Sequence, residues 1–301
     1  MIAAPEYELL RQGAGVVERP RGKLLLRGAE AAEFLQGQVT NDVEALAPGT
    51  GCYALLLNHK GKVRVDMRVL RGPDWIWIDC PKGGVAVLDH MFRTYGIGRD
   101  LRLEDVTESR TLLSVLGPRA REALGVDPPL EEHAFVERDG VLHVATDAGI
   151  DVIAPAGHSL DGVEPVSEEA AECLRVEAGR PRFGFDFDSE TIPQEAGLNE
   201  RGVSFTKGCY VGQETVARLH YKGKPNRHLR GLRLSEPAER GAELRLGERV
   251  VGALGSVAES PVHGPIALAL VRREAEPGAR VEVGDAGATA QVVELPFRTS
   301  T

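Results

Sequence analysis

Apolar residues recur at helical spacing in several stretches of the first 180 residues. In residues 30–39, the side chains of Ala31, Phe34 and Leu35 fall on one helical face, and TND at 40–42 supplies turn-forming residues. We therefore expect an amphipathic helix over 30–39. The same spacing predicts helices at 84–95, 118–124 and 167–178, the last with Ser167 as its N-cap and Gly179 at its end.

Other stretches follow the two-residue period of strands. Residues 53–57 form an apolar run, NHKG at 58–61 is a turn sequence, and residues 62–70 alternate between polar and apolar positions. This pattern predicts a β-hairpin. Further strands are expected at 75–79 and 109–116, and two or three more within 133–153.

The texture of the chain changes twice after residue 180. Residues 180–228 have little periodicity and many Gly, Pro, Asn, Asp and Glu residues, and such long irregular regions are more often functional than idle. Short strands at regular spacing then predict a small antiparallel barrel. These strands are expected at 229–234, 243–246, 250–257, 266–271, 280–283 and 288–295. The basic, Gly- and Pro-containing linker at 222–230 places a domain boundary between residues 224 and 225.

Charge and length narrow the classes of function. The 301 residues carry 36 basic and 45 acidic side chains, a net charge of −9, whereas a protein that binds nucleic acid over its whole surface is normally basic. No stretch approaches the roughly 18 consecutive apolar residues of a membrane span, and the N-terminus has no basic flank or apolar run typical of a signal peptide. We expect a cytoplasmic protein without a membrane partner.

The four cysteines, at 52, 80, 173 and 209, are far apart and form no CxxC or other metal-ligand spacing. In a cytoplasmic chain this predicts four free thiols and no metal site.

The densest candidate for chemistry is KGCYVGQE at residues 207–214. Cys209 follows Lys207 and precedes an expected helix at 212–219, and both a basic neighbour and a helix N-terminus favour a thiolate. No histidine in the segment suggests a Cys/His dyad. The alternative is that Cys209 is a small buried residue at a helix start.

Two acidic segments and one basic run are weaker candidates. Glu177 ends the expected helix at 167–178, where the helix dipole disfavours a carboxylate unless a ligand supplies donors, and Glu195 is an isolated acid in a polar loop. Both could simply be solvated. The basic run could hold an anionic tail, a phosphate or a nucleic-acid backbone, or it could be a solvated linker. Its members are Arg218, His220, Lys222, Lys224, Arg227, His228 and Arg230.

The segment 207–214 resembles the K-G-C-Y-x-G-Q-E signature of the YgfZ family, folate-binding proteins of iron–sulfur cluster assembly and repair. All eight positions match. FLQGQVTND at 34–42, LRVEAG at 174–179 and PQEAGL at 193–198 resemble segments of the wider superfamily of the glycine-cleavage T-protein, an aminomethyltransferase. The resemblance spans about residues 30–298.

This resemblance implies an α+β fold, with two interleaved ferredoxin-like lobes in residues 1–224 and a small antiparallel β-barrel in 225–301. It implies a tetrahydrofolate site, or a site for a one-carbon derivative, between the lobes. Glu177 would accept hydrogen bonds from the pterin N3–H and 2-amino groups, Cys209 would be the reactive residue, and the basic run would serve the folate tail or a partner. The cofactor contacts implied with Glu177 are Asp66, Lys207, Tyr210, Gln213 and Arg218.

One departure separates the sub-families. The T-protein carries a G-G-I-x-D-D turn whose first Asp serves methylene transfer, and the ungapped alignment with GKVRVD at 61–66 places Val65 there and leaves Asp66 as the second acid. A valine cannot take a proton or stabilise an iminium, so we expect folate binding without aminomethyl transfer.

We therefore expect a folate-binding protein that supports iron–sulfur enzymes, with client iron–sulfur proteins or assembly factors as partners. Whether it is an enzyme stays open. One alternative is a folate-dependent aminomethyltransferase or other one-carbon transferase, acting on a protein-bound amine or on tRNA. Another is a binding module without chemistry, which predicts a buried, inert Cys209.

Overall fold

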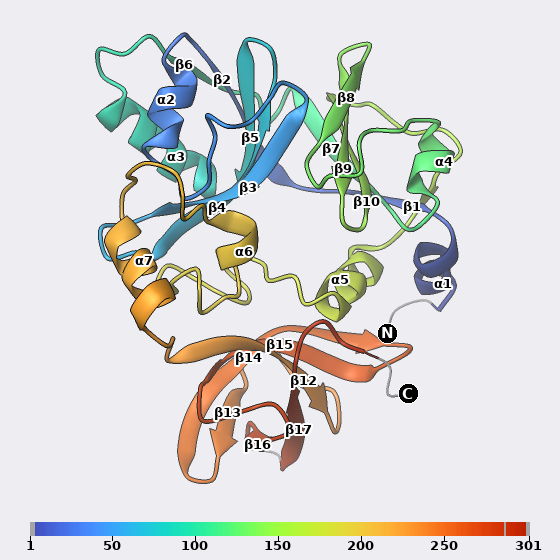
Figure 1. Ribbon diagram of the computed structural model, residues 1–301. Coiled ribbons are helices and arrows are strands. Elements are labelled where there is room, and N and C mark those ends of the chain that lie inside the picture. The colour runs from blue at the N-terminus through green and yellow to red at the C-terminus, as the bar shows by residue number, and fades with distance from the viewer. Residues whose placement is uncertain (1–3, 286, 299–301) are drawn as a thin grey trace. The chain divides into compact units, whose positions relative to one another are not determined.

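The computed structural model describes residues 4–285 and 287–298 (Figure 1). Contacts group them into two compact units, neither of which is continuous in sequence. Unit 2 comprises residues 8–166 and 199–215, and unit 1 comprises the chain up to Tyr7, residues 167–198 and the chain from Val216 onward. Helices α1 (Ala4–Gln12) and α7 (Gln213–Lys222) each contain a point where the chain passes from one unit to the other. The expected domain boundary at 224/225 stays a prediction.

Unit 2 is built on two β-sheets. The first has the order β3-β4-β5-β2-β6 and is antiparallel throughout, and the second has the order β11-β1-β7-β10-β9-β8, with one parallel pair, β1–β11. The strands of the first are β2 (Arg21–Arg27), β3 (Thr50–Leu57), β4 (Val63–Arg71), β5 (Trp75–Pro81) and β6 (Arg102–Asp105). Those of the second are β1 (Gly15–Glu18), β7 (Arg110–Leu116), β8 (Phe135–Arg138), β9 (Val141–Thr146), β10 (Gly149–Pro155) and β11 (Glu164–Pro165).

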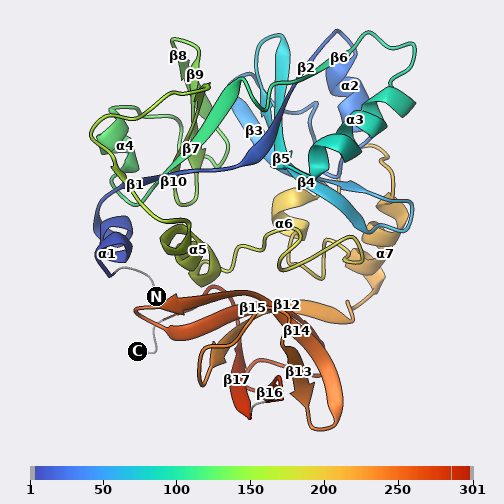
Figure 2. The same ribbon diagram turned by 180° about the vertical axis from the view of Figure 1, so that it is seen from behind.

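Helices cover one face of the first sheet. Both α2 (Ala31–Gln36) and α3 (Gly84–Tyr95) contribute to a core cluster with the apolar side chains of β2, β4 and β5 (Figure 2). Phe34 of α2 and Phe92 of α3 meet there with ring centroids 5.2 Å apart. The opposite face packs toward the second sheet, where Trp77 shares a cluster with Leu112, Val144 and Ile153. The first sheet is therefore buried on both faces. Short helices α4 (Ala120–Leu124) and α6 (Asn199–Gly202) complete unit 2.

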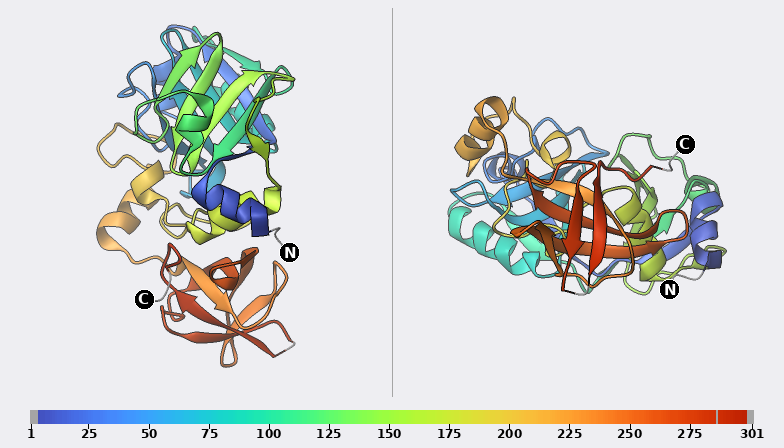
Figure 3. Two further views of the ribbon diagram at one scale, coloured as in Figure 1. Left: turned by 90° about the vertical axis from the view of Figure 1, so that its right-hand side faces the viewer. Right: turned by 90° about the horizontal axis from the view of Figure 1, so that it is seen from below.

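Unit 1 combines α5 (Glu168–Glu177), an irregular stretch and a closed six-stranded barrel, shown from two further directions in Figure 3. Helix α5 contacts β14 and β15 of the barrel. The barrel order is β12-β15-β14-β13-β16-β17, and every pair is antiparallel. Its strands are β12 (Arg227–Leu234), β13 (Glu243–Leu246), β14 (Arg249–Ser260), β15 (Gly264–Arg272), β16 (Arg280–Val283) and β17 (Ala288–Val293).

The structure confirms most of the predicted elements. The hairpin is β3–β4, the region 133–153 contains β8, β9 and β10, and the six expected barrel strands are β12 to β17. Ser167 caps α5 by accepting a hydrogen bond from Ala170 N, and Gly179 follows the helix with φ +68°. Helix α2 is shorter than expected because Val39 leaves the helix and forms a β-bridge with Leu56. Six elements were not predicted from the sequence: α1, β1, β2, β6, β11 and α6.

Candidate functional sites

Cys209 lies in an irregular segment, residues 203–212, that ends where α7 begins. It is exposed, and the other cysteines are buried or partly buried. All four are free thiols, as the sequence predicts. The exposure contradicts the expectation of the binding-module alternative, which requires a buried Cys209.

Lys207 fixes the first end of this segment. Its ammonium group donates hydrogen bonds to the main-chain carbonyls of Gln36, Val39 and Asn41, at 2.6, 2.7 and 2.8 Å. These three carbonyls lie at and just beyond the C-terminal end of α2, where orphaned carbonyls favour a cation. Burial lowers the pKa of Lys207 to about 8, while nearby Asp42 counteracts this effect. The side chain therefore joins two parts of the chain.

Further hydrogen bonds join the same two parts. Ser204 N donates to Thr40 O at 3.0 Å, Thr40 Oγ1 donates to Gly202 O at 2.5 Å, and Asn41 Nδ2 donates to Arg201 O at 3.2 Å. Thr40 is fully buried. The TND segment, predicted only as a turn, thus holds residues 201–207 in place.

Two glycines fix the other end. Gly212 has φ +85°, and a Cβ on it would lie 2.5 Å from Asn58 O. Gly61, in the turn of the β3–β4 hairpin, has φ +75°, and a Cβ there would lie 2.9 Å from the Cβ of Thr215. Only glycine permits this close approach of the hairpin turn to the start of α7. Residues 208–211 are consequently held between two anchors.

This geometry corrects the expected activation of Cys209. The helix begins four residues after it, and the dipole acts within the first turn, so Cys209 does not sit at a helix N-terminus. The three N–H donors of Lys207 are all used by carbonyls. The thiol has no hydrogen-bond partner among the described residues. The structure therefore shows Cys209 as a thiol that solvent can reach, on a loop that is anchored at both ends.

The remaining motif residues have different surroundings. Tyr210 is buried, and its ring lies 5.3 Å from the Lys207 ammonium. Burial raises the pKa of Tyr210 to about 12. Gln213 is partly buried at the first position of α7, and Arg218 is exposed on the same helix. Lys207 and Tyr210 thus form the base of the loop.

Glu177 lies at the last position of α5 and is 7% exposed. Its Oε1 accepts hydrogen bonds from Tyr7 Oη at 2.9 Å, from Ser260 Oγ and from Cys173 Sγ at 3.6 Å. None of these three donors contacts Oε2. The carboxylate is held by three donors on one oxygen, which leaves the other available to an external donor. The solvated alternative for Glu177 is wrong.

Glu195, expected as an isolated acid, is paired. Arg227 contacts it through Nε at 3.1 Å and Nη2 at 2.8 Å, and Glu195 also accepts a bond from Ile192 N at 3.2 Å. Leu229 N donates to Glu195 O at 2.8 Å. This residue fastens the irregular stretch to β12, and one member of the basic run is used in doing so.

Asp66 and Val65 point to opposite faces of β4. Val65 is 1% exposed within the apolar cluster of α2 and α3, against Gly84. Asp66 is 6% exposed; its Oδ2 accepts a 2.8 Å bond from Tyr53 Oη, whereas Oδ1 has no hydrogen-bond partner in the described chain. Burial raises the pKa of Asp66. An acid at position 65 would point into the core, so Val65 alone does not decide whether transfer chemistry is possible.

A buried charge network, not foreseen from the sequence, continues from Asp66 between the two sheets. Arg68 contacts Asp79 at 2.7 Å and Asp151 at 2.6 Å, and Arg21 contacts Asp79 at 2.5 Å. Burial alone would raise the pKa of Asp79, but Arg68 and Arg21 outweigh it and lower the pKa. The alternation of charged and apolar residues along 63–70 was the available signal, since it places Asp66 and Arg68 on one face.

His133 borders this network with a strained backbone. Its φ is +71°, it is 7% exposed, and neither ring nitrogen has a hydrogen-bond partner among the described residues. Burial, with Arg68 and Arg201 nearby, lowers the pKa of His133 to about 3. The imidazole is therefore neutral at physiological pH.

The described residues offer neither a metal site nor a membrane-spanning helix. No group of three or more His, Cys, Asp or Glu side chains is arranged to hold a metal ion. No described helix is long and apolar enough to cross a membrane.

Comparisons with known proteins agree on one family. A family model for the GCVT N-terminal domain matches residues 1–134, and a model for the glycine cleavage T-protein C-terminal barrel domain matches residues 227–298. An aminomethyltransferase of Thermotoga petrophila is 30% identical over 327 residues, covering 97% of this chain and 88% of that protein. A chloroplast protein of Arabidopsis thaliana described as a transferase is 25% identical over 259 residues, and the match covers 78% of this chain but only 59% of the plant protein.

The fold has a close counterpart among solved structures. The crystal structure of glycine cleavage system aminomethyltransferase T from Bartonella henselae superposes with a TM-score of 0.88 at 23% identity, over 98% of this chain and 89% of that one. The predicted α+β fold with a C-terminal antiparallel barrel is thereby confirmed.

Proposed function

The chain belongs to the glycine cleavage T-protein family, and on this premise we propose that it is a tetrahydrofolate-binding protein of the YgfZ type that supports iron–sulfur enzymes. The observation that carries the proposal is the KGCYVGQE segment, which is complete in sequence and forms an anchored loop with an exposed Cys209. In this proposal, residues 1–224 form the folate-binding region and 225–301 the barrel domain. The partners are client iron–sulfur proteins or assembly factors, and the setting is the cytoplasm, where thiols stay reduced.

The chemistry of Glu177 fits a folate. A pterin presents N–H donors, and Glu177 offers a buried carboxylate whose Oε2 is not used by Tyr7, Ser260 or Cys173. Asp66 offers a buried oxygen, Oδ1, that has no hydrogen-bond partner in the described chain. Bound tetrahydrofolate would supply a carrier for one-carbon groups, and the residues of this chain would bind and orient it. Lys207 and Tyr210 support the loop, and Gln213 and Arg218 remain proposed contacts.

Calorimetric titration with tetrahydrofolate tests the binding site. Glu177→Gln should weaken binding roughly tenfold or more, because a charge-assisted hydrogen bond contributes about 1.5–3 kcal/mol. Glu259→Gln is the matched control, since Glu259 is an exposed carboxylate beside Ser260. Equal affinity in wild type and Glu177→Gln excludes Glu177 as the pterin anchor.

The iron–sulfur role needs a separate test. Cells that lack their own homologue should regain activity of iron–sulfur enzymes when they express the wild-type chain but not Cys209→Ser. Rescue by Cys209→Ser at equal protein level contradicts the proposed role of the thiol.

A second function, folate-dependent aminomethyl or one-carbon transfer, is favoured by one observation. Asp66 presents a carboxylate with an unpaired oxygen on the polar face of β4, so the chain has an acid in this strand despite Val65. An assay with aminomethylated lipoyl-protein and tetrahydrofolate tests it, with Asp66→Asn as the inactive variant. Turnover that depends on Asp66 supports transfer, and no turnover in wild type leaves the first proposal.

A further inference from the structure

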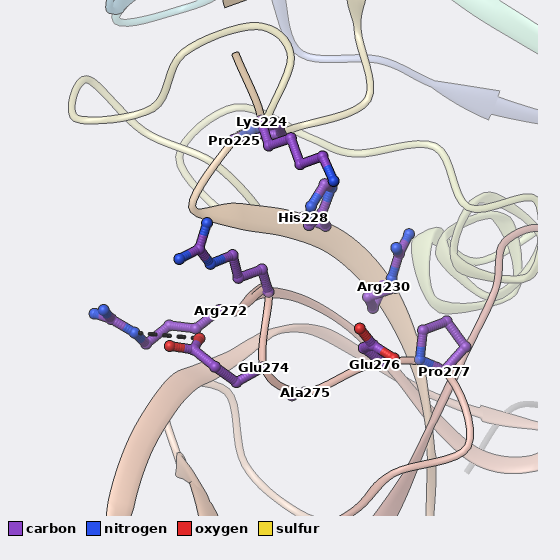
Figure 4. Close-up of a pocket in the computed structure, with 10 residues that line it drawn as sticks. Lys224, Pro225, His228, Arg230, Arg272, Glu274, Ala275, Glu276 and Pro277 are labelled. Carbon is purple, nitrogen blue, oxygen red and sulfur yellow. Dashed lines mark ion pairs between the residues drawn. The ribbon is translucent and has the colours of Figure 1, made fainter.

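A hollow of about 530 Å³ opens on the barrel domain, and three members of the basic run, Lys224, His228 and Arg230, line it (Figure 4). One wall is formed by Lys224 of the linker and by His228 and Arg230 of β12. The other is formed by Arg272 at the end of β15 and by the turn that follows it, up to Pro277. Figure 4 shows the side chains of Lys224, His228 and Arg230 along one wall and those of Arg272, Glu274 and Glu276 on the other. The volume is typical of a small-molecule site.

The backbone fixes these two walls to each other. Arg273 N donates to Asn226 O at 2.9 Å, next to the β12–β15 ladder, in which Arg227 pairs with Arg272. The turn is closed by Ala275 N, which donates to Arg272 O at 2.9 Å, and Ala275 is 2% exposed. The hollow is therefore a built feature of the barrel.

The hollow is positive in a chain of net charge −9. Its lining carries four permanently cationic side chains, two carboxylates and one histidine. Burial and neighbouring Arg230 lower the pKa of His228, so the imidazole adds no charge at neutral pH. The lining thus has a net charge of +2 from Lys224, Arg230, Arg272 and Arg273 against Glu274 and Glu276.

Internal ion pairs leave this charge incompletely neutralised. Arg272 lies 3.7 Å from Glu274, but Glu274 also pairs with Arg249 at 2.8 Å. Arg230 pairs with Glu294 at 3.2 Å. In the described part of the chain, neither Lys224 nor Arg273 forms a close ion pair, and Glu274, the carboxylate that Arg273 influences, is already shared with Arg249 and Arg272. Like charges gathered in one hollow repel one another unless an anion compensates them.

The hollow is separate from the Glu177 site within the same unit. Ser260, which holds Glu177, pairs with Gly264 at the start of β15, and Arg272 is at the strand's other end. Eight residues of extended strand span roughly 26 Å. Arg272 therefore marks the end of the hollow that is farther from Glu177, while Arg230 lies nearer, beside Glu294 of the segment in which Phe297 N donates to Glu177 O.

We propose that this hollow binds a compact dianion: a phosphate monoester group or a pair of neighbouring carboxylates. The net charge of +2 matches a dianion, and guanidinium groups bind both phosphate and carboxylate through paired hydrogen bonds. Glu274 and Glu276 at the turn disfavour longer polyanions through like-charge repulsion, so the ligand is a small molecule or a single charged terminus.

Calorimetric titration at constant ionic strength tests this proposal with three probes: inorganic phosphate, glutarate and chloride. We expect one of the two dianions to bind at least tenfold more tightly than chloride. Tighter phosphate binding identifies a phosphate monoester as the source, and tighter glutarate binding identifies a dicarboxylate. If neither exceeds chloride, the proposal is overturned.

Variants locate the binding. Lys224→Gln combined with Arg273→Gln should weaken the favoured dianion at least tenfold, and both side chains are exposed, so the fold should persist. The double variant Arg245→Gln, Arg280→Gln removes the same charge elsewhere on the barrel and should bind like wild type. Glu177→Gln should also bind the dianion normally, which separates this site from the proposed folate site. If both double variants lose the same affinity for the dianion, the binding reflects general charge attraction, and the proposed site is excluded.

Discussion

Cys173 and Cys209 carry the same side chain in different surroundings, one in each compact unit. Cys173, in unit 1, is fully buried on α5 and donates its S–H to the Glu177 carboxylate. Burial, with Glu177 nearby, raises the pKa of Cys173 to about 12. Cys209, in unit 2, is exposed on a segment fixed at both ends. One thiol helps to hold the Glu177 carboxylate, and the other is accessible from solvent.

The difference shows that order and access are separate properties. Around Glu177, the donors that create order also occupy one oxygen of the carboxylate. In the Cys209 loop, Lys207 and Gly212 create order from either side and leave the centre open. A reactive residue needs the second arrangement because its supports must not occupy the space of the reaction partner.

The largest expected effect is a difference in alkylation rate between Cys209 and Cys173. At neutral pH, iodoacetamide should modify Cys209 at least about a thousandfold faster than Cys173, because a thiol with a pKa near 12 has only about one thiolate in 10⁵ and is also buried. Mass spectrometry of the labelled peptides gives both rates. Cys80, also buried with its pKa raised to about 12, is an internal control and should react as slowly as Cys173. Comparable rates for Cys173 and Cys209 would remove the contrast.

The next effect concerns the anchor. Lys207→Met leaves three carbonyls without their donor, so the free energy of unfolding should fall by roughly 3 kcal/mol, and protease cleavage within 203–212 should accelerate. Urea denaturation and limited proteolysis measure the two changes. Lys60→Met, at an exposed lysine in the hairpin turn, is the control. If both variants are equally stable, the loop is not anchored through Lys207.

The third effect extends the comparison to His133, which is buried like Glu177 but lacks hydrogen-bond partners. The pKa of His133 is about 3 in the folded chain, below the ordinary value of 6.5. Between these two values, the unfolded chain binds a proton at His133 and the folded chain does not. Stability is full above pH 6.5 and falls as the pH drops toward 3, by roughly 2 kcal/mol at pH 5 from this residue. The charged groups around it are Arg68, Arg201, Asp79 and Asp151, together with Glu132, whose carboxylate lies 3.7 Å from His133 Nε2.

Urea denaturation at pH 7.5 and pH 5 measures this loss. His133→Asn has no titrating ring and tolerates the positive φ, so it should lose roughly 2 kcal/mol less than wild type between the two values. An identical pH dependence in both proteins shows that His133 is protonated in the folded state.

The smallest effect is expected at Cys209. Cys209→Ser should change the free energy of unfolding by no more than about 0.5 kcal/mol, since the side chain is exposed and contributes no packing. Thermal and urea denaturation against wild type provide the measurement. A larger loss of unfolding free energy would mean that Cys209 contributes to packing and is not an accessible thiol.

Local patterns in the sequence predict much of this fold. The alternation along 53–70 and the regular strands after residue 226 depend on neighbours close in the chain, and the structure confirms them. Ser167 and Gly179 follow the same rule because helix ends are determined within a few residues. The Cys209 segment was also found from its composition.

Long-range partners could not be predicted in this way. Lys207 reaches carbonyls 166 to 171 positions earlier, and carbonyls leave no trace in a sequence. Glu195 was expected to be isolated because Arg227, 32 positions later, was interpreted as part of a basic linker. Which of Val65 and Asp66 points into the apolar core depends on which face of β4 the helices cover. A motif alignment does not contain that information.

The hydrogen bonds that Tyr7 and Ser260 donate to Glu177 can form only in a fixed order during synthesis. Tyr7 is made 170 residues before Glu177, and Ser260 is made 83 residues after it. At roughly 5–20 residues per second, a ribosome needs several more seconds after Glu177 before the last of these donors exists. Unit 2 has its full sequence by residue 215, whereas unit 1 must wait for the barrel. The nascent chain therefore passes through a period in which the Cys209 loop can already form while Glu177 is still unclamped.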